Sequence, residues 1–136
     1  GGTTDYAVEI YYKALEEGRY TCFLNENRAL PMMYMDDAIR ATIELTEAPA
    51  EQIKVRSSYN LAGISFDPTT IAASVADLIP SFTMDCVPDF RDEIAASWPE
   101  SINDETAQKD WGWSMEYDLD RMSKAMIENL KKKLNT

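Results

Sequence analysis

Two hydroxyl side chains stand at the start of the first predicted helix. Thr3 and Thr4 precede the acidic residue Asp5, and apolar positions then recur at helical spacing until Gly18. Hydroxyls and unpaired backbone N–H groups at a helix N-terminus suit a bound carboxylate. Threonine is also a common N-cap, so these residue types fit either a carboxylate site or a helix cap alone.

The other residue types limit the chemistry that the chain itself could perform. The sequence has no histidine, which excludes His-based triads, His general bases and nearly every transition-metal site. No Tyr is followed four residues later by Lys, and no GxSxG motif is present. The glycines cannot form a GxGxxG loop or a P-loop; they are Gly1, Gly2, Gly18, Gly63 and Gly112. We therefore predict no catalytic residue and no cofactor-binding residue in this chain.

Two acidic groups could be imagined as ligands of a hard cation. They are Asp36 with Asp37, and Asp118 with Asp120, and both stand where helices are predicted to start. A carboxylate is stabilised at that end by the helix macrodipole, whereas a Ca²⁺ or Mg²⁺ site needs several oxygens converging at a defined spacing. We therefore interpret both groups as helix-start residues and predict no metal site.

Composition and charge describe one folded domain over residues 1–136. The sequence carries 24 Asp and Glu against 13 Lys and Arg, a formal net charge of −11 that would repel a nucleic-acid backbone. No apolar run approaches the roughly 20 residues that span a bilayer. Cys22 and Cys86 form no CxxC or Cys/His group, so we expect reduced thiols in a cytoplasmic protein. Neither nucleic acid nor a membrane is expected as a partner.

Hydrophobic periodicity predicts an α/β protein. Helices are expected over residues 4–18, 36–48, 67–79 and 118–134, and Ile39 and Ile43 share the apolar face of the second. Strands are expected in RYTCFL, ALPMMYM, SSYNLAG and SFTMDCV, the first two as a strand pair. Short helices and loops follow from PDFRDEIAASWP onward. Helices and strands alternating in this order are typical of the α/β class.

Three stretches carry a resemblance to a known family. GGTTDYAVEIYYKAL, LPMMYMDDAIRATIELTEAP and DFRDEIAASWPESINDETAQKDWGW resemble, in this order, the C-terminal third of the short-chain-dehydrogenase type of L-threonine 3-dehydrogenase. YNLAGISFDPTTIA is also similar to a segment of that family. The resemblance extends over essentially the whole chain, and these motifs are narrower than those of the broad extended short-chain superfamily.

The resemblance implies a fold and an activity for the intact enzyme. In this family a Rossmann domain binds NAD through a glycine loop and carries a Tyr-x-x-x-Lys pair, and a smaller C-terminal subdomain closes over the substrate. The enzyme oxidises L-threonine to 2-amino-3-ketobutyrate. Neither the loop nor the pair is present here, and by the resemblance both would lie N-terminal to Gly1. We therefore expect a substrate-binding subdomain that is inactive without its missing Rossmann domain.

The resemblance also implies which residues touch the substrate. Thr3 and Thr4 match a segment that lines the threonine pocket, and Trp98 matches an indole that closes over the substrate and excludes water. Trp111 and Trp113 are interpreted as packing residues.

Other conspicuous residues are expected to have structural roles. In relatives that bind nucleotide sugars an Arg of this subdomain pairs with the diphosphate, but a threonine enzyme has none, so Arg91 is expected to pair with a neighbouring acid. Tyr34, Asp36 and Asp37 match a segment that returns the chain beneath the site, and we expect no substrate contact from them.

Two other interpretations remain open at this stage. The parent could be a nucleotide-sugar epimerase or dehydratase, although few Arg residues and a compact Thr/Trp set favour a small substrate. The chain could also be a stand-alone binding or interaction domain without catalysis. A surface that should pack on the Rossmann domain would be exposed and apolar, so we expect a homo-oligomer. A mitochondrial location stays open if the parent is eukaryotic.

Overall fold

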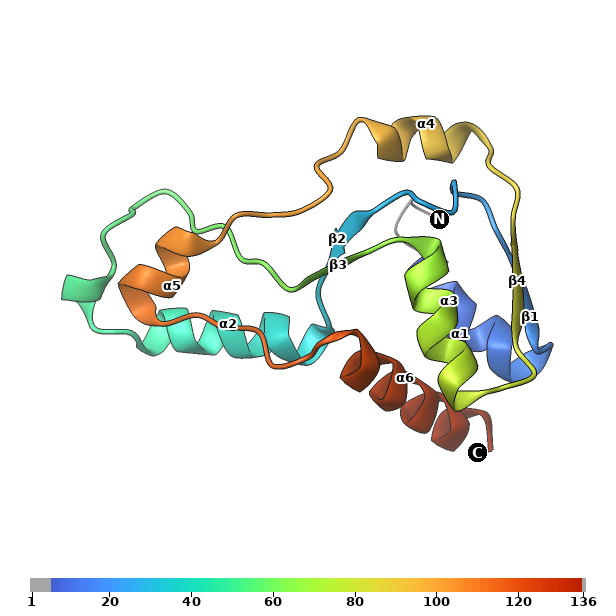
Figure 1. Cartoon of the computed structure of the whole chain (residues 1–136). Coiled ribbons are helices and arrows are strands. Elements are labelled where there is room, and N and C mark those ends of the chain that lie inside the picture. The colour runs from blue at the N-terminus through green and yellow to red at the C-terminus, as the bar shows by residue number, and fades with distance from the viewer. Residues whose placement is uncertain (1–5, 136) are drawn as a thin grey trace.

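The strands of the chain form two separate two-stranded sheets (Figure 1). The computed structural model describes residues 6–135. β1 (Arg19–Cys22) pairs in parallel with β4 (Thr83–Cys86), and β2 (Leu30–Met32) pairs antiparallel with β3 (Ile64–Phe66). The helices are α1 (Tyr6–Glu16), α2 (Met35–Glu47), the 3-10 helix η1 (Ala50–Gln52), α3 (Pro68–Leu78), α4 (Phe90–Ala96), α5 (Glu105–Trp111) and α6 (Leu119–Leu134). The chain therefore has the predicted α/β fold. No helix within residues 6–135 has both the length and the apolar composition needed to cross a bilayer.

The main core lies where α1, α3 and α6 pack beside the β1–β4 sheet, at one end of the molecule (Figure 1). A buried row of hydroxyls connects the three helices inside it. Tyr11 Oη lies 2.9 Å from Ser123 Oγ, which lies 2.9 Å from Ser74 Oγ. Because a buried hydroxyl that loses its partner costs about 1–3 kcal/mol, these bonds favour one rotation of each helix.

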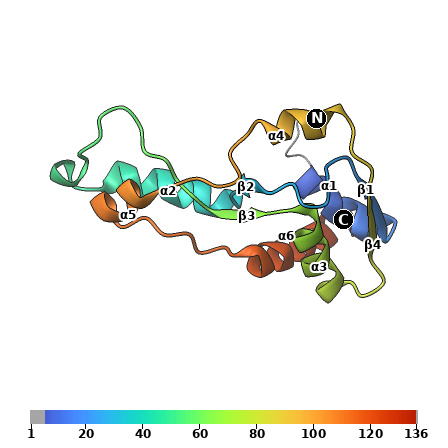
Figure 2. The ribbon, with the colours of Figure 1, turned by 45° about the horizontal axis from the view of Figure 1, so that its top comes forward.

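A second, smaller core lies at the opposite end, between α2 and α5 (Figures 1 and 2). Its buried residues are Ala41, Ala107 and Trp113, and Trp111 packs against them. The indole N–H of Trp113 donates to the carbonyl of Ala62 at 3.1 Å. Both tryptophans are packing residues, as predicted.

Local signals in the sequence placed the helix ends correctly. The carboxylate of Asp67 accepts from the backbone N–H of Thr70 at the start of α3, and Asp118 accepts from Arg121 at the start of α6. Gly18, with a φ of 66°, follows α1. The predicted cap of α1, Thr4, lies outside the described residues.

Two predictions about the strands are wrong. RYTCFL and ALPMMYM contain β1 and β2, but the two do not pair with each other, since each pairs with a later strand. SSYNLAG forms no strand. The strand begins only at Ile64, since Ser57 lies in a bend, residues 58–63 have no regular secondary structure, and within residues 6–135 no strand pairs with them. A strand pattern alone cannot form a sheet without a partner.

The buried face of α2 is also different from the one predicted. Ile39 and Ile43 are 52% and 50% exposed, whereas Ala41 and Asp37 are fully buried. The helix packs through these two residues because the segment after α5 passes along that side. The isoleucines therefore form an exposed apolar face, which we call the α2 face, together with Met35.

Asp37 joins α2 to the segment that leads into α6. Its carboxylate, 1% exposed, accepts from the backbone N–H groups of Tyr117 at 2.9 Å and Glu116 at 3.2 Å, and from the guanidinium of Arg40 at 2.9 Å. Arg40 also donates to the carbonyl of Ser114. Burial opposes ionisation of Asp37, but these donors outweigh it, so the pKa of this carboxyl lies below its usual value. The expected helix-start position is correct, but these long-range bonds were not predicted.

We expect Asp37→Asn to destabilise the chain by about 3 kcal/mol at neutral pH, since the donors around it would lose an ionised acceptor. A lowered folded pKa means that the stabilisation is complete above the unfolded value, about 3.9, and is lost as pH falls through the folded value. Urea unfolding as a function of pH should therefore show a smaller acid-dependent loss of stability in the variant.

Asp36→Asn is the matched control, because Asp36 lies in the same helical turn but is exposed, and the bond that it accepts from the Tyr117 hydroxyl at 3.2 Å can also be accepted by an amide oxygen. Its free energy of unfolding should stay within about 0.5 kcal/mol of the parent. Equal losses in both variants would show that Asp37 has no special role.

Candidate functional site

Of the three residues predicted to touch a substrate, only Trp98 can be placed. Thr3 and Thr4 lie outside the described residues. Trp98 follows the last turn of α4, where its backbone N–H donates to the carbonyl of Ala95 at 3.0 Å. Its side chain is 42% exposed, so the indole is available for contact with another group.

Helix α4 lies at one edge of the molecule, joined by loops to β4 and α5 (Figures 1 and 2). Asp89 caps it by accepting from the backbone N–H of Arg91 at 2.9 Å. Ala95 is its only buried residue, whereas Phe90 and Ile94, one turn apart, are 68% and 46% exposed. Burial of apolar side chains therefore contributes little to holding α4 in place.

An ion pair attaches α4 to the loop before β2. The guanidinium of Arg28 binds the carboxylate of Asp92 through two bonds, Nε to Oδ1 at 2.9 Å and Nη2 to Oδ2 at 3.0 Å. The backbone N–H of Asn25 also donates to Asp92, at 2.9 Å. The Arg28 hydrogen bonds, helped by that N–H, hold the pKa of the Asp92 carboxyl below its usual value. Sequence analysis missed this pair, because nothing in the local pattern relates two residues 64 positions apart.

Phe23 connects the first turn of α1 with α4. The ring of Tyr6 meets that of Phe23 edge to face at a centroid distance of 6.5 Å, and the guanidinium of Arg91 lies 3.5 Å from the Phe23 centroid. Arg91 also forms the predicted ion pair with a neighbouring acid, Asp89, at 2.6 Å. The start of α1 and the helix that carries Trp98 are therefore linked through one aromatic ring.

Tyr6 itself is a buried polar residue at the start of α1. Its hydroxyl has no hydrogen-bond partner among the described residues, and burial raises its pKa far above the usual value. A phenol in this state is a neutral group, so Tyr6 is unsuited to act as a base.

The two cysteines lie opposite each other in the β1–β4 sheet. Cys22 and Cys86 are partners in the parallel register, and both thiols are free. Burial raises the pKa of Cys22 to about 12 and also raises that of Cys86. Because the thiolate is the nucleophile, these residues are poorly reactive.

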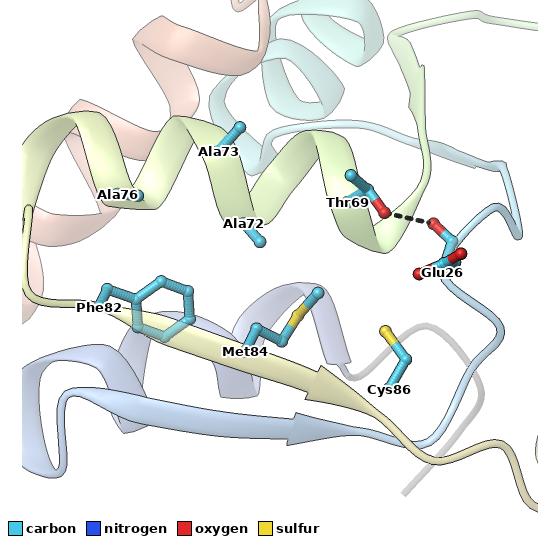
Figure 3. A pocket seen from close by; sticks show the side chains of 8 residues that line it. All are labelled: Glu26, Thr69, Ala72, Ala73, Ala76, Phe82, Met84 and Cys86. Atoms are coloured by element: carbon cyan, nitrogen blue, oxygen red, sulfur yellow. Dashed lines mark hydrogen bonds between the residues drawn. The ribbon is translucent and has the colours of Figure 1, made fainter.

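A groove of about 350 Å³ lies between α3 and β4 (Figure 3). Small side chains of α3, among them Ala72 and Ala76, face Phe82 and Met84 across it. None of the residues predicted to bind a substrate lines this groove. Within residues 6–135 there is also no group of three or more acidic or cysteine residues placed to hold a metal ion.

Curated relatives match almost the whole chain but less than half of their own length. No family model matches. An uncharacterized epimerase/dehydratase of Staphylococcus aureus (strain USA300) is 46% identical over 134 residues, which is 98% of this chain and 42% of the relative. Its counterpart in strain NCTC 8325 matches to the same extent.

Solved structures give a narrower match. The GalE-like L-threonine dehydrogenase of Cupriavidus necator in its apo form is 55% identical, with a TM-score of 0.91 over 96% of this chain and 47% of that one. The L-threonine dehydrogenase of Phytophthora infestans is 51% identical, with a TM-score of 0.94 over 98% of this chain and 43% of that one. The L-threonine dehydrogenase of Clostridium difficile is 44% identical, with a TM-score of 0.94 over 98% of this chain and 42% of that one.

The α/β fold and these matches define the class, which is that of the extended short-chain dehydrogenases. Within that class, the chain is similar to a C-terminal part of the GalE-like L-threonine dehydrogenases. The resemblance inferred from the sequence is confirmed. The matched part, 42–47% of those solved chains, is larger than the third that was expected.

Proposed function

We propose that this chain is the substrate-binding part of an NAD-dependent L-threonine 3-dehydrogenase, inactive without the rest of the enzyme. The observation that carries the proposal is the 44–55% identity to solved L-threonine dehydrogenases over nearly the whole chain. The chain spans less than half the length of these proteins. We assign it one subdomain over residues 1–136.

Thr3 and Thr4 are the proposed binding groups for the carboxylate of L-threonine. Thr4 is two residues from Tyr6, so about 7 Å of extended chain at most separates them. Tyr6 is linked through Phe23 to α4, which leads to Trp98. The two threonines and the indole are therefore assigned to one pocket, where Trp98 excludes water from the reacting centre.

The NAD site is assigned to the remainder of the enzyme, because the described residues do not fit a dinucleotide. Gly18 and Gly112 follow helices, each with a positive φ. Gly63 permits the close approach of β3 to β2, since an added Cβ would lie 2.5 Å from the Met32 carbonyl oxygen. None of these glycines forms a loop at a helix N-terminus that could hold a pyrophosphate.

A nucleotide-sugar epimerase or dehydratase is the second candidate, because the curated relatives carry that name. Such a site needs cationic side chains free to bind a diphosphate. Arg91 of α4 and Arg28 of the loop before β2 are instead paired with Asp89 and Asp92. This pairing favours threonine as the substrate.

The intact polypeptide that contains this chain should reduce NAD⁺ in the presence of L-threonine, measured as NADH absorbance. Thr4→Val should lower kcat/KM about 10- to 100-fold, the loss expected from one hydrogen bond to a charged group. Thr4→Ser, which keeps the hydroxyl, is the control and should retain most activity. Tight binding of a UDP-sugar with no oxidation of threonine would exclude the proposal.

The 136-residue chain alone should show no heat of NAD binding in calorimetry.

The isolated chain should also self-associate, as measured by light scattering. We assign the α2 face, Met35, Ile39 and Ile43, to contact with the missing Rossmann domain, and this face would be uncovered in the isolated chain. Ile39→Glu with Ile43→Glu should shift the chain toward monomer. Ile102→Glu, at an exposed isoleucine outside this face, is the control. Measurable NAD affinity, or a monomer at high concentration without substitution, would contradict this expectation.

A further inference from the structure

The position of α4 depends on polar contacts. Apart from Ala95 its side chains are not buried, and the Asp89–Arg91 pair lies within its own first turn and so cannot hold the helix to the body. The backbone N–H of Asp89 donates to the carbonyl of Phe23 at 3.1 Å. The guanidinium of Arg91 also lies over the Phe23 ring, 3.5 Å from its centroid, at the same first turn of α4. The remaining polar attachment of α4 to the body is the carboxylate of Asp92.

The loop that receives Asp92 is itself firmly held. The side chain of Asn25 accepts from the backbone N–H of Asn27 at 3.0 Å, and the carbonyl of Glu26 accepts from the hydroxyl of Thr69 at 3.0 Å (Figure 3). The second contact joins the loop to the start of α3, a helix that packs in the main core. Asp92 therefore binds α4 to a loop that is itself attached to that helix.

The geometry of the Arg28–Asp92 pair makes it a strong attachment. Both bonds are short and the side chains are only 30% and 14% exposed, so water screens the pair less than it would at the surface. Further along the chain, the hydroxyl of Ser65 in β3 donates to the carbonyl of Glu100. Trp98 lies between these two attachments, six residues after Asp92 and two before Glu100.

We propose that Arg28 and Asp92 are positioning residues that fix α4 and so hold Trp98 over the substrate pocket. The proposal rests on the function proposed above for Trp98. Neither residue touches the substrate, and both act through the indole. Loss of the pair leaves the first turn of α4 held at Phe23 by Asp89 and Arg91, but removes the two charged bonds to the loop. The end of α4 that carries Trp98 then moves more freely, so that the indole no longer excludes water in a fixed position.

Hydrogen exchange of the intact polypeptide tests the attachment without any assay of activity. Arg28→Gln should raise the exchange rate of amides in residues 90–98 by about tenfold, and leave the amides of α3 and α6 unchanged. The matched control is Arg19→Gln, which removes the exposed Arg19–Asp85 pair and should leave residues 90–98 unchanged. Unchanged exchange of residues 90–98 in Arg28→Gln would overturn the proposal.

A double-mutant cycle tests whether the pair acts through the indole. Arg28→Gln and Trp98→Ala should each lower kcat/KM for L-threonine by about tenfold, and the double variant should lose no more than Trp98→Ala alone. Asp92→Asn should resemble Arg28→Gln, and Arg28→Lys should recover only part of the activity, because Lys cannot form both bonds. If the two losses in kcat/KM multiply in the double variant, the Arg28–Asp92 pair does not act through Trp98, and the proposal is overturned.

The two proposals fail in different ways. If the unsubstituted polypeptide does not oxidise L-threonine, the proposed function is wrong. The proposed role of Arg28 and Asp92 in holding Trp98 over a threonine pocket is then wrong as well. The exchange rates of residues 90–98 still decide whether the Arg28–Asp92 pair fixes α4.

Discussion

One buried carboxylate determines how the two hydrophobic cores of this chain are joined. Asp37 is enclosed where α2 meets the segment that leads into α6, and a buried charge is stable only if its oxygens are fully bonded. The backbone N–H groups of Glu116 and Tyr117 and the guanidinium of Arg40 meet that requirement. Because these donors come from both sides of the junction, the small α2–α5 core takes one orientation relative to the main core.

The two cores differ in how complete they are. The main core encloses its aromatic and aliphatic side chains between three helices and the β1–β4 sheet. The smaller core instead leaves the isoleucines of α2 exposed, and among the described residues no strand pairs with residues 57–63. An exposed apolar helix face of this kind is typical of an interaction surface.

Helix α4 is held in place mainly by polar contacts, unlike the helices of the main core. It is attached to the main body through an arginine–carboxylate pair, the contact of Arg91 with the Phe23 ring and a few backbone hydrogen bonds, with little apolar burial. Contacts of this kind fix direction well, since a bidentate pair has a defined geometry. They also allow a helix to carry exposed aromatic and aliphatic side chains, such as Phe90 and Trp98, toward whatever lies beside it.

The sequence by itself determined the features that depend on near neighbours. Asp67 and Asp118 cap helices and Arg91 pairs with Asp89, because these interactions act within a few residues. The α/β class could also be predicted, from the alternation of helical and strand periodicity along the chain. The motifs also identified the family. Only the tertiary structure decided that Asp37 and Ala41, and not Ile39 and Ile43, face inward, that residues 57–63 lack a partner strand, and that Arg28 binds Asp92. Burial and strand pairing depend on which distant segments of the chain come together. Helical or strand periodicity identifies an apolar face of an element, but it does not identify the segment that packs on that face.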